Sequence, residues 1–260
     1  MLPLAGSLSR GQLPALAFFL EASRESRNNQ IIDTTVRFSL GGDNMATGAR
    51  VKVYKSGRIR LDNETQILLS AEQEFAEHGF QGASINSIAK RAGIPRTNVH
   101  YYFNNKLDLY MAILEGVIEL WNDAFSRISV DDDPAEALGA YIHAKVMYSR
   151  SNPHASKIFA SEIIHGAPNL TRYFKKEFRP WFNAKAGVIQ AWIEQGKMDA
   201  IDPYYLIFLI WSATQHYADF NLQVCAGLGK SRLTEKDYEA VSDNLTRIIL
   251  KGCGLKPPGR

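Results

Sequence analysis

The chain has 260 residues, of which 45% are hydrophobic and 22% charged, and its formal net charge is +3. This is ordinary for a folded protein with one large or two smaller domains. A net charge so near zero excludes a uniformly basic surface as the basis of nucleic-acid binding. The two cysteines, Cys225 and Cys253, argue against a disulfide framework or a zinc site. The chain has no run of about 18 or more apolar residues, so no membrane span is predicted, and we expect a cytoplasmic protein.

Residues 1–60 are predicted to form a flexible extension that ends in a basic arm. The segment from Ala46 to Arg60 has no acidic residue and five basic ones, namely Arg50, Lys52, Lys55, Arg58 and Arg60. Such an arm either contacts DNA phosphates or a minor groove, or is a solvated tail, and both interpretations are open. The first residues lack the basic n-region of a signal peptide. Met45 is an alternative start, the other interpretation being a native extension.

Residues 61–106 are predicted to form three helices with a tight turn between the second and the third. The first helix should end at His78-Gly79. Its apolar stripe at helical spacing consists of Ile67, Leu68, Ala71, Phe75 and Ala76. Ser84 is the predicted N-cap of the second helix, and Gly93 supplies the left-handed turn after it. Pro95 suits the first turn of the third helix, where a missing N–H costs nothing.

The third helix should divide its surface into two faces. At about 100° per residue, one face carries Arg96, Thr97, His100 and Tyr101, and the opposite face carries Val99, Tyr102 and Phe103. The first set can reach bases and phosphates, while the second set can pack on the preceding helices. A short helix of this kind behind a tight turn is typical of a recognition helix in the major groove of DNA.

Residues 107–252 are predicted to be a second, entirely helical domain, with a tail at 253–260. The predicted helices are 106–128, one through 138–146, 153–164, 168–195 with a kink or split at Pro180, 203 to about 224, and 235–251. Thr234 to Asp237 resembles a capping box at the start of the last helix. No strand pattern stands out, so the fold class is all-α.

The last two predicted helices are strongly apolar. Residues 206–211 are consecutive apolar residues, and a helix that is apolar all round is buried or shared with a partner. Helices 203–224 and 235–251 would form half of a four-helix homodimer interface. A two-fold dimer would place two recognition helices one DNA turn apart, which matches a near-palindromic operator.

Trp211 and Gln215 lie one turn apart on the same predicted helix face. The glutamine amide offers both a donor and an acceptor, and the indole offers a flat stacking surface. Trp121, on the long helix after the DNA module, could close a pocket with them and couple it to that module. The other interpretation is that the tryptophans are core residues and that Gln215 serves a dimer interface. The chemistry alone favours this second interpretation.

Five segments of residues 79–106 closely resemble the N-terminal signature of TetR-family repressors. They are Gly79-Phe80, Ser84-Ile85, Ile88-Ala89, Ala92-Gly93-Ile94 and Val99 to Lys106. The resemblance implies phosphate contacts by Ser84, His100, Tyr101 and Lys106. It implies base contacts mainly by Arg96 and Thr97, with Asn98 as a weaker candidate. Family members commonly have Tyr at the position of His100, whose shorter side chain would make a pH-sensitive contact.

Residues 211–220 and 79–121 also resemble pyrimidine-responsive members of the same family. This similarity extends over most of residues 60–252, and it implies a uracil- or thymine-like effector bound by Trp121, Trp211 and Gln215. The expected protein is a dimeric repressor that leaves operator DNA when the effector binds. The alternatives are a regulator of another small nitrogenous metabolite and a DNA-binding protein without ligand control.

An enzyme is not expected. The six histidines show no metal-ligand spacing, and the chain has no Ser/His/Asp arrangement and no glycine-rich phosphate motif. We therefore assign no catalytic residue, no metal site and no cofactor.

Overall fold

The computed structural model describes the backbone of residues 56–256 and the side chains of residues 63–256. Most of the predicted basic arm, the alternative start at Met45 and the last four residues of the tail lie outside this range. The end of the predicted extension was wrong, because residues 56–60, with Arg58 and Arg60, already belong to the first described helix, which begins at Ser56. The described residues contain helices and no strand, so the predicted all-α class is confirmed. None of these helices is long and apolar enough to cross a membrane.

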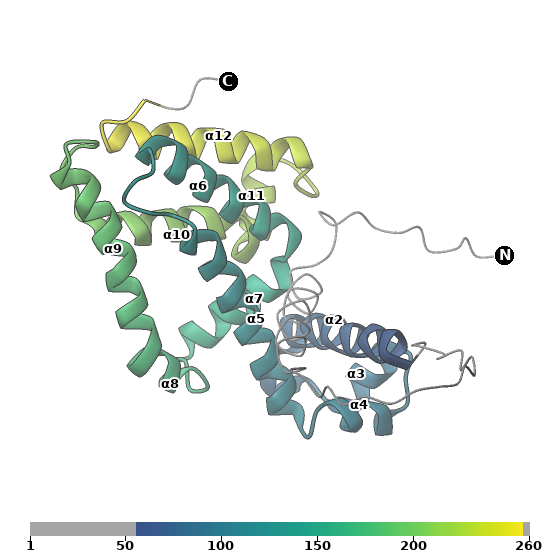
Figure 1. Cartoon of the computed structure of the whole chain (residues 1–260). Helices are drawn as coiled ribbons and strands as arrows, with labels where there is room; N and C mark the ends of the chain where they lie inside the picture. Colours follow the sequence, from purple (N-terminus) through teal and green to yellow (C-terminus); the bar gives the residue numbers. More distant parts are fainter. Residues whose placement is uncertain (1–55, 257–260) are drawn as a thin grey trace, which may run out of the picture.

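The helices fall into a small module and a larger bundle (Figure 1). In chain order they are α2 (Ser56–Gly82), α3 (Ile85–Ala92), α4 (Arg96–Tyr102), α5 (Lys106–Ser126), α6 (Pro134–Ser151), α7 (Pro153–Ile164), α8 (Thr171–Tyr173), the π-helix η1 (Phe174–Phe178), α9 (Arg179–Glu194), α10 (Pro203–Asp219), α11 (Asn221–Leu228) and α12 (Glu235–Gly252). Helices α2 to α4 form the module, and α5 runs from it into the bundle.

Helix α5 is shared by two hydrophobic cores. Its first half places Leu109, Ile113 and Leu114 in a core with α2, α3 and α4. Its last turn places Phe125 in a second core, which is built mainly from α6, α9, α10 and α12. A helix of 21 residues is about 30 Å long, so α5 is long enough to serve both cores. Any shift of α5 therefore alters the packing of both cores.

Proline and capping residues begin most helices of the bundle, because they favour helical starts locally. Asp133 and Asp202 each accept two backbone N–H bonds at the starts of α6 and α10, and a proline follows each of them. The predicted capping box at the start of α12 is confirmed, with Thr234 and Asp237 bonding each other's backbone N–H.

The structure differs from the predicted helix boundaries at three further places. Helix α2 does not end at His78-Gly79; Gly79 adopts φ 68 and ψ 174, which favours glycine, and the helix resumes to Gly82. The helix predicted from 168 begins at Thr171 instead, and the kink or split predicted at Pro180 takes the form of a π turn, η1, directly before α9, because Pro180 has no N–H. The helix expected to reach 224 breaks at Phe220, where the Asn221 amide donates to the carbonyl of Tyr217.

Helix α7 packs against the DNA-side module through a buried carboxylate. Glu72 of α2 is only 7% exposed, and it accepts a hydrogen bond from the backbone N–H of Ala155 in the first turn of α7. An acceptor at this point caps a helix start, where backbone N–H groups have no partner in their own helix. Burial raises the pKa of Glu72 to about 7.

Replacing Glu72 by Gln should remove a pH dependence of stability. The folded protein keeps a proton on Glu72 between its ordinary pKa of 4.5 and about 7, whereas the unfolded chain releases it. The contribution of Glu72 to stability therefore falls as the pH rises through this interval. Glu72→Gln keeps an acceptor for Ala155 and has no proton to lose. At pH 8 the free energy of unfolding of this variant should therefore exceed that of the parent protein by up to about 3 kcal/mol.

Urea unfolding at pH 5 and pH 8 checks this expectation. Glu115→Gln is the matched control, because Glu115 is exposed on α5. The raised pKa of Glu72 would be contradicted if the free energy of unfolding of Glu72→Gln changed between pH 5 and pH 8 by as much as that of the parent protein.

Candidate DNA interface and ligand cavity

Helix α3 is closed at both ends by the residues predicted to close it. The Ser84 hydroxyl accepts from the backbone N–H of Ser87 at 3.0 Å, and the Ser87 hydroxyl accepts from that of Ser84 at 3.2 Å. Gly93 has φ 68 and ψ 26, and its N–H bonds the carbonyls of Ala89 and Lys90. This left-handed turn sets the direction in which α4 leaves.

Helix α4 has the two predicted faces. Val99 is fully buried, Phe103 is 9% exposed, and Tyr102 is partly buried against the first core. The side chains of Arg96, Thr97, Asn98, His100 and Tyr101 are exposed. Pro95 stands just before the helix and not inside its first turn. Burial of one face fixes the helix on its module and leaves the other face available to a partner.

Two of the basic groups predicted to meet DNA have intramolecular partners. The Nε of Arg96 donates to Nε2 of His100 at 3.3 Å, one turn away. The Nζ of Lys106 donates to the carbonyls of Ala83 at 2.9 Å and of Gln81 at 3.4 Å, and it lies 4.7 Å from the centroid of the Phe80 ring. The cationic head of Lys106 thus lies beside the end of α2, just before Ser84, and it helps to hold the connection between α2 and α3.

Arg91 of α3 ties the module together. Its guanidinium donates to Glu77 at 2.6 Å and to Glu74 at 3.2 Å, both on α2. In the described part of the chain, Glu74, Glu77 and His78 are the one group close enough to hold a metal ion together. The guanidinium already supplies the positive charge there, so these residues are explained as an ion-pair network.

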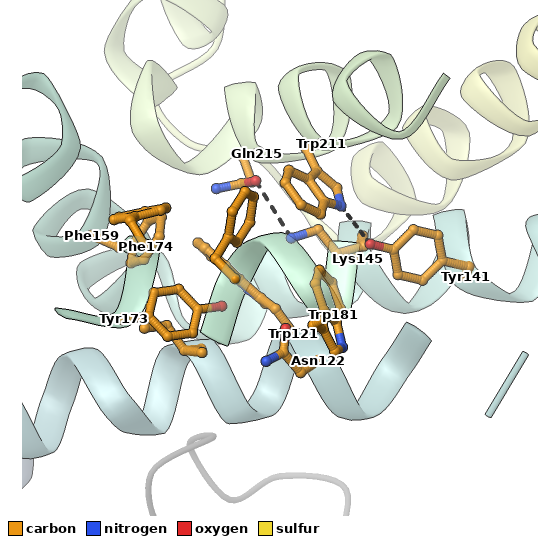
Figure 2. Close-up of a pocket in the computed structure, with 12 residues that line it drawn as sticks. Trp121, Asn122, Tyr141, Lys145, Phe159, Tyr173, Phe174, Trp181, Trp211 and Gln215 are labelled. Carbon is orange, nitrogen blue, oxygen red and sulfur yellow. Dashed lines mark hydrogen bonds between the residues drawn. The ribbon is translucent and has the colours of Figure 1, made fainter. Parts of the chain in front are cut away.

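The bundle encloses a cavity next to α5 (Figure 2). Its volume is about 60 Å³, which suits a ligand of one small ring better than the ~300–1,000 Å³ pockets of drug-sized molecules. It is lined by Ile118, Trp121 and Asn122 of α5, Tyr141 and Lys145 of α6, Phe159 of α7, Tyr173 of α8, Phe174 and Phe178 of η1, Trp181 of α9, and Trp211 and Gln215 of α10. Most of the lining is aromatic.

The structure brings together the three residues predicted to bind a ligand. Trp121, Trp211 and Gln215 all line this cavity, although 90 residues separate Trp121 from Trp211 in the sequence. The indole N–H of Trp211 donates to the hydroxyl of Tyr141 at 2.6 Å, and its ring stacks on that of Trp181. These contacts hold the Trp211 ring in one orientation.

Lys145 is the charged residue of the lining, and it was not predicted from the sequence. Its side chain is 1% exposed, and its Nζ lies 3.9 Å from the centroid of the Trp121 ring and 3.5 Å from Oε1 of Gln215. Burial lowers the pKa of Lys145 to about 7, against the opposing field of Asp219. Only the fold places this lysine, one of many in the chain, inside a cavity, so no local pattern distinguished it.

The cavity lies at the boundary of the two cores. Ile118 belongs to the first core, and Trp211 and Trp181 pack against the second. Phe159 of α7 contacts Trp121 edge to face, with ring centroids 4.8 Å apart. Helices α5 and α7, which both touch the DNA-side module, therefore also form cavity walls.

Family models match nearly all of the described chain. The model for "Bacterial regulatory proteins, tetR family" matches residues 67–113, and the model for "YcdC-like protein, C-terminal region" matches residues 114–256. Their boundary falls within α5.

Similar proteins are transcriptional regulators. The HTH-type transcriptional regulator RutR of Escherichia coli K12 is 36% identical over 208 residues, covering 80% of this chain and 98% of that protein. The HTH-type transcriptional repressor NicS of Pseudomonas putida KT2440 is 28% identical over 56% of this chain and 67% of that protein.

Solved structures share the fold. A bacterial regulatory protein of the tetR family from Rhodococcus RHA1 aligns with a TM-score of 0.60 at 16% identity, over 75% of this chain and 98% of that one. The TetR family regulator PfmR from Thermus thermophilus aligns with a TM-score of 0.58 at 17% identity, over 75% and 99%. The chain thus belongs to the TetR family of bacterial transcriptional regulators, which are not enzymes.

Proposed function

We propose that this protein is a homodimeric repressor that binds a near-palindromic operator and is released by a pyrimidine-like effector such as uracil or thymine. The observation that carries the proposal is the aromatic cavity with a glutamine amide in its wall, placed where the two cores meet. The similarity of the chain to RutR supports a pyrimidine as the effector, which is a flat ring with amide edges. Such a protein acts in the cytoplasm, on the chromosome.

The exposed face of α4 is the proposed DNA-reading surface. Arg96 and Thr97 are assigned to base edges in the major groove, with Asn98 as a weaker candidate. Ser84, His100, Tyr101 and Lys106 are assigned to phosphates, where they would set the register of the helix on the duplex. Each of these side chains is exposed except that of Lys106, which is partly buried.

The proposed dimer interface is formed by the exposed apolar face of α10, α11 and α12. Phe208 and Leu209 are 46% and 50% exposed, Leu222 is 86% exposed, and Ile248 is 62% exposed. Apolar side chains this exposed on neighbouring helices mark a surface that a partner covers. In α10, Leu206, Ile207 and Ile210 are buried within the protomer, so this helix can serve the core and the partner together.

Helix α5 is the proposed coupling element. An effector that contacts Trp121 acts on a helix whose first half belongs to the core of the DNA-binding module. A ligand shifts an equilibrium only by its difference in affinity for two states. The proposed two states differ in the position of α5, and hence in the spacing of the two recognition helices.

Replacing Arg96 by Ala should weaken operator binding by about 1–3 kcal/mol if its guanidinium reads a base. Binding to random DNA should change much less. Fluorescence anisotropy with an operator selected by the protein from randomised DNA measures both affinities. Arg127→Ala is the matched control, since Arg127 is exposed at the far end of α5. An equal loss on both DNAs would instead assign Arg96 to a phosphate.

Saturating uracil or thymine should lower operator affinity by about 5- to 150-fold, the usual range of coupling between two sites. It should also raise the melting temperature of the protein, because a ligand of the folded state stabilises it. Anisotropy and thermal-shift titrations measure the two effects. Operator affinity that is unchanged at saturating concentrations of both bases would refute the proposed switch.

Charges placed on the apolar face should separate the dimer. Leu209→Glu and Ile248→Glu should each yield a folded monomer, because both side chains are exposed in the protomer and an unpaired charge is costly to bury between subunits. Light scattering coupled to size exclusion measures the mass. The control is Ile164→Glu, at an apolar position that is 75% exposed on α7. A dimer that persists in both variants would place the interface elsewhere.

A further inference from the structure

Lys145 and Gln215 stand side by side in the cavity wall. The Nζ of Lys145 and the Oε1 of Gln215 are 3.5 Å apart, at the outer limit of a hydrogen bond. No ion pair found among residues 63–256 includes Lys145. The lysine is thus a buried donor whose one hydrogen bond is long; the face of Trp121 and the field of Asp219 also favour its charge but accept no hydrogen bond from it.

The orientation of the Gln215 amide follows from the chemistry of its neighbour. An ammonium group has three donors and no acceptor, so the amide must turn its oxygen, not its nitrogen, towards Nζ. Figure 2 shows the oxygen on the side of Lys145 and the nitrogen on the far side. The cavity wall therefore presents one donor and one acceptor on adjacent positions.

This donor–acceptor pair is complementary to one kind of ligand edge. The matching edge carries an acceptor and a donor on neighbouring atoms that point in the same direction. A cis amide within a ring, a lactam, has this arrangement, whereas a trans amide directs its C=O and N–H to opposite sides. A carboxylate offers two acceptors, so one of them would face the Gln215 oxygen.

We propose that Lys145 and Gln215 together read the lactam edge of a planar ring, with the lysine donating to the ring carbonyl and the glutamine oxygen accepting from the ring N–H. This proposal rests on the proposed function, in which the cavity is the effector site, and it names the edge that is read. The indole rings of Trp121 and Trp211 provide apolar walls for the faces of such a ring.

Matched pairs of small lactams test the proposal by isothermal titration of the full chain. The pairs are 2-pyridone with 1-methyl-2-pyridone, and uracil with 1,3-dimethyluracil. The parent compounds should bind, and N-methylation should weaken binding at least about tenfold, because it removes the N–H and leaves the buried acceptor unpaired. Comparable affinity of both members of each pair would overturn the proposal.

Two variants separate hydrogen bonding from simple crowding by the added methyl group. Lys145→Met should weaken the binding of 2-pyridone and of uracil at least about tenfold. Gln215→Met should reduce the discrimination against the N-methyl compounds to near unity; discrimination that persists there would overturn the role of Gln215. Lys157→Met is the control, because Lys157 is exposed on α7.

The Lys145→Met variant should fold, because an apolar side chain of similar length replaces a buried cation. Its melting temperature should equal or exceed that of the parent. Unchanged lactam affinity in this folded variant would overturn the role of the lysine.

The possible failures can be distinguished. If 2-pyridone binds through both residues and uracil does not bind, the lactam reader stands and the pyrimidine effector fails. If uracil releases operator DNA equally well in both variants, the proposed function stands and the lactam reader fails. If neither lactam binds the parent protein, the lactam reader fails, and an operator titration with thymine decides the proposed function separately.

Discussion

The double burial of α5 is the constraint on which the rest of the structure depends. One end of this helix is held in the core of the DNA-binding module and the other in the core of the bundle, so neither core can form fully without it. Trp121 and Asn122, about one turn before Phe125, face the cavity that lies between the cores. Protein cores are close-packed, so we expect a change at the cavity wall to shift the helix and not to be absorbed locally.

Features determined by neighbouring residues were predictable from the sequence. The Ser84 cap, the left-handed turn at Gly93 and the two faces of α4 depend on side chains within a few residues of each other, and all three were confirmed. Boundaries that depend on tertiary packing were predicted less well. The break at Phe220 follows no glycine or proline, and the π turn before Pro180 is one of several ways in which a helix accommodates a proline.

The residues of the cavity also differ in whether the sequence could predict them. Trp211 and Gln215 lie one turn apart on one helix, so their common face could be inferred. Lys145 comes from α6, and its meeting with Gln215 depends on how α6 packs on α10. In the sequence it is a lysine among apolar residues, a pattern that usually places the ammonium in water. Its burial against Trp121 is a property of the assembled bundle and has no local signal.

In the proposed effector site, the burial of Lys145 would link ligand affinity to the position of the helices. A buried cation costs free energy, and within the protein a long hydrogen bond, the face of an indole and the field of Asp219 offset only part of that cost. A ligand carbonyl at this point stabilises the ammonium more than either contact does, because hydrogen bonds to charged groups are the strong ones. This gain requires Lys145 on α6, Gln215 on α10 and Trp121 on α5 to close around the same small ring. The proposed ligand interaction would therefore also favour one arrangement of α5, which is what the proposed coupling to the DNA-binding module requires.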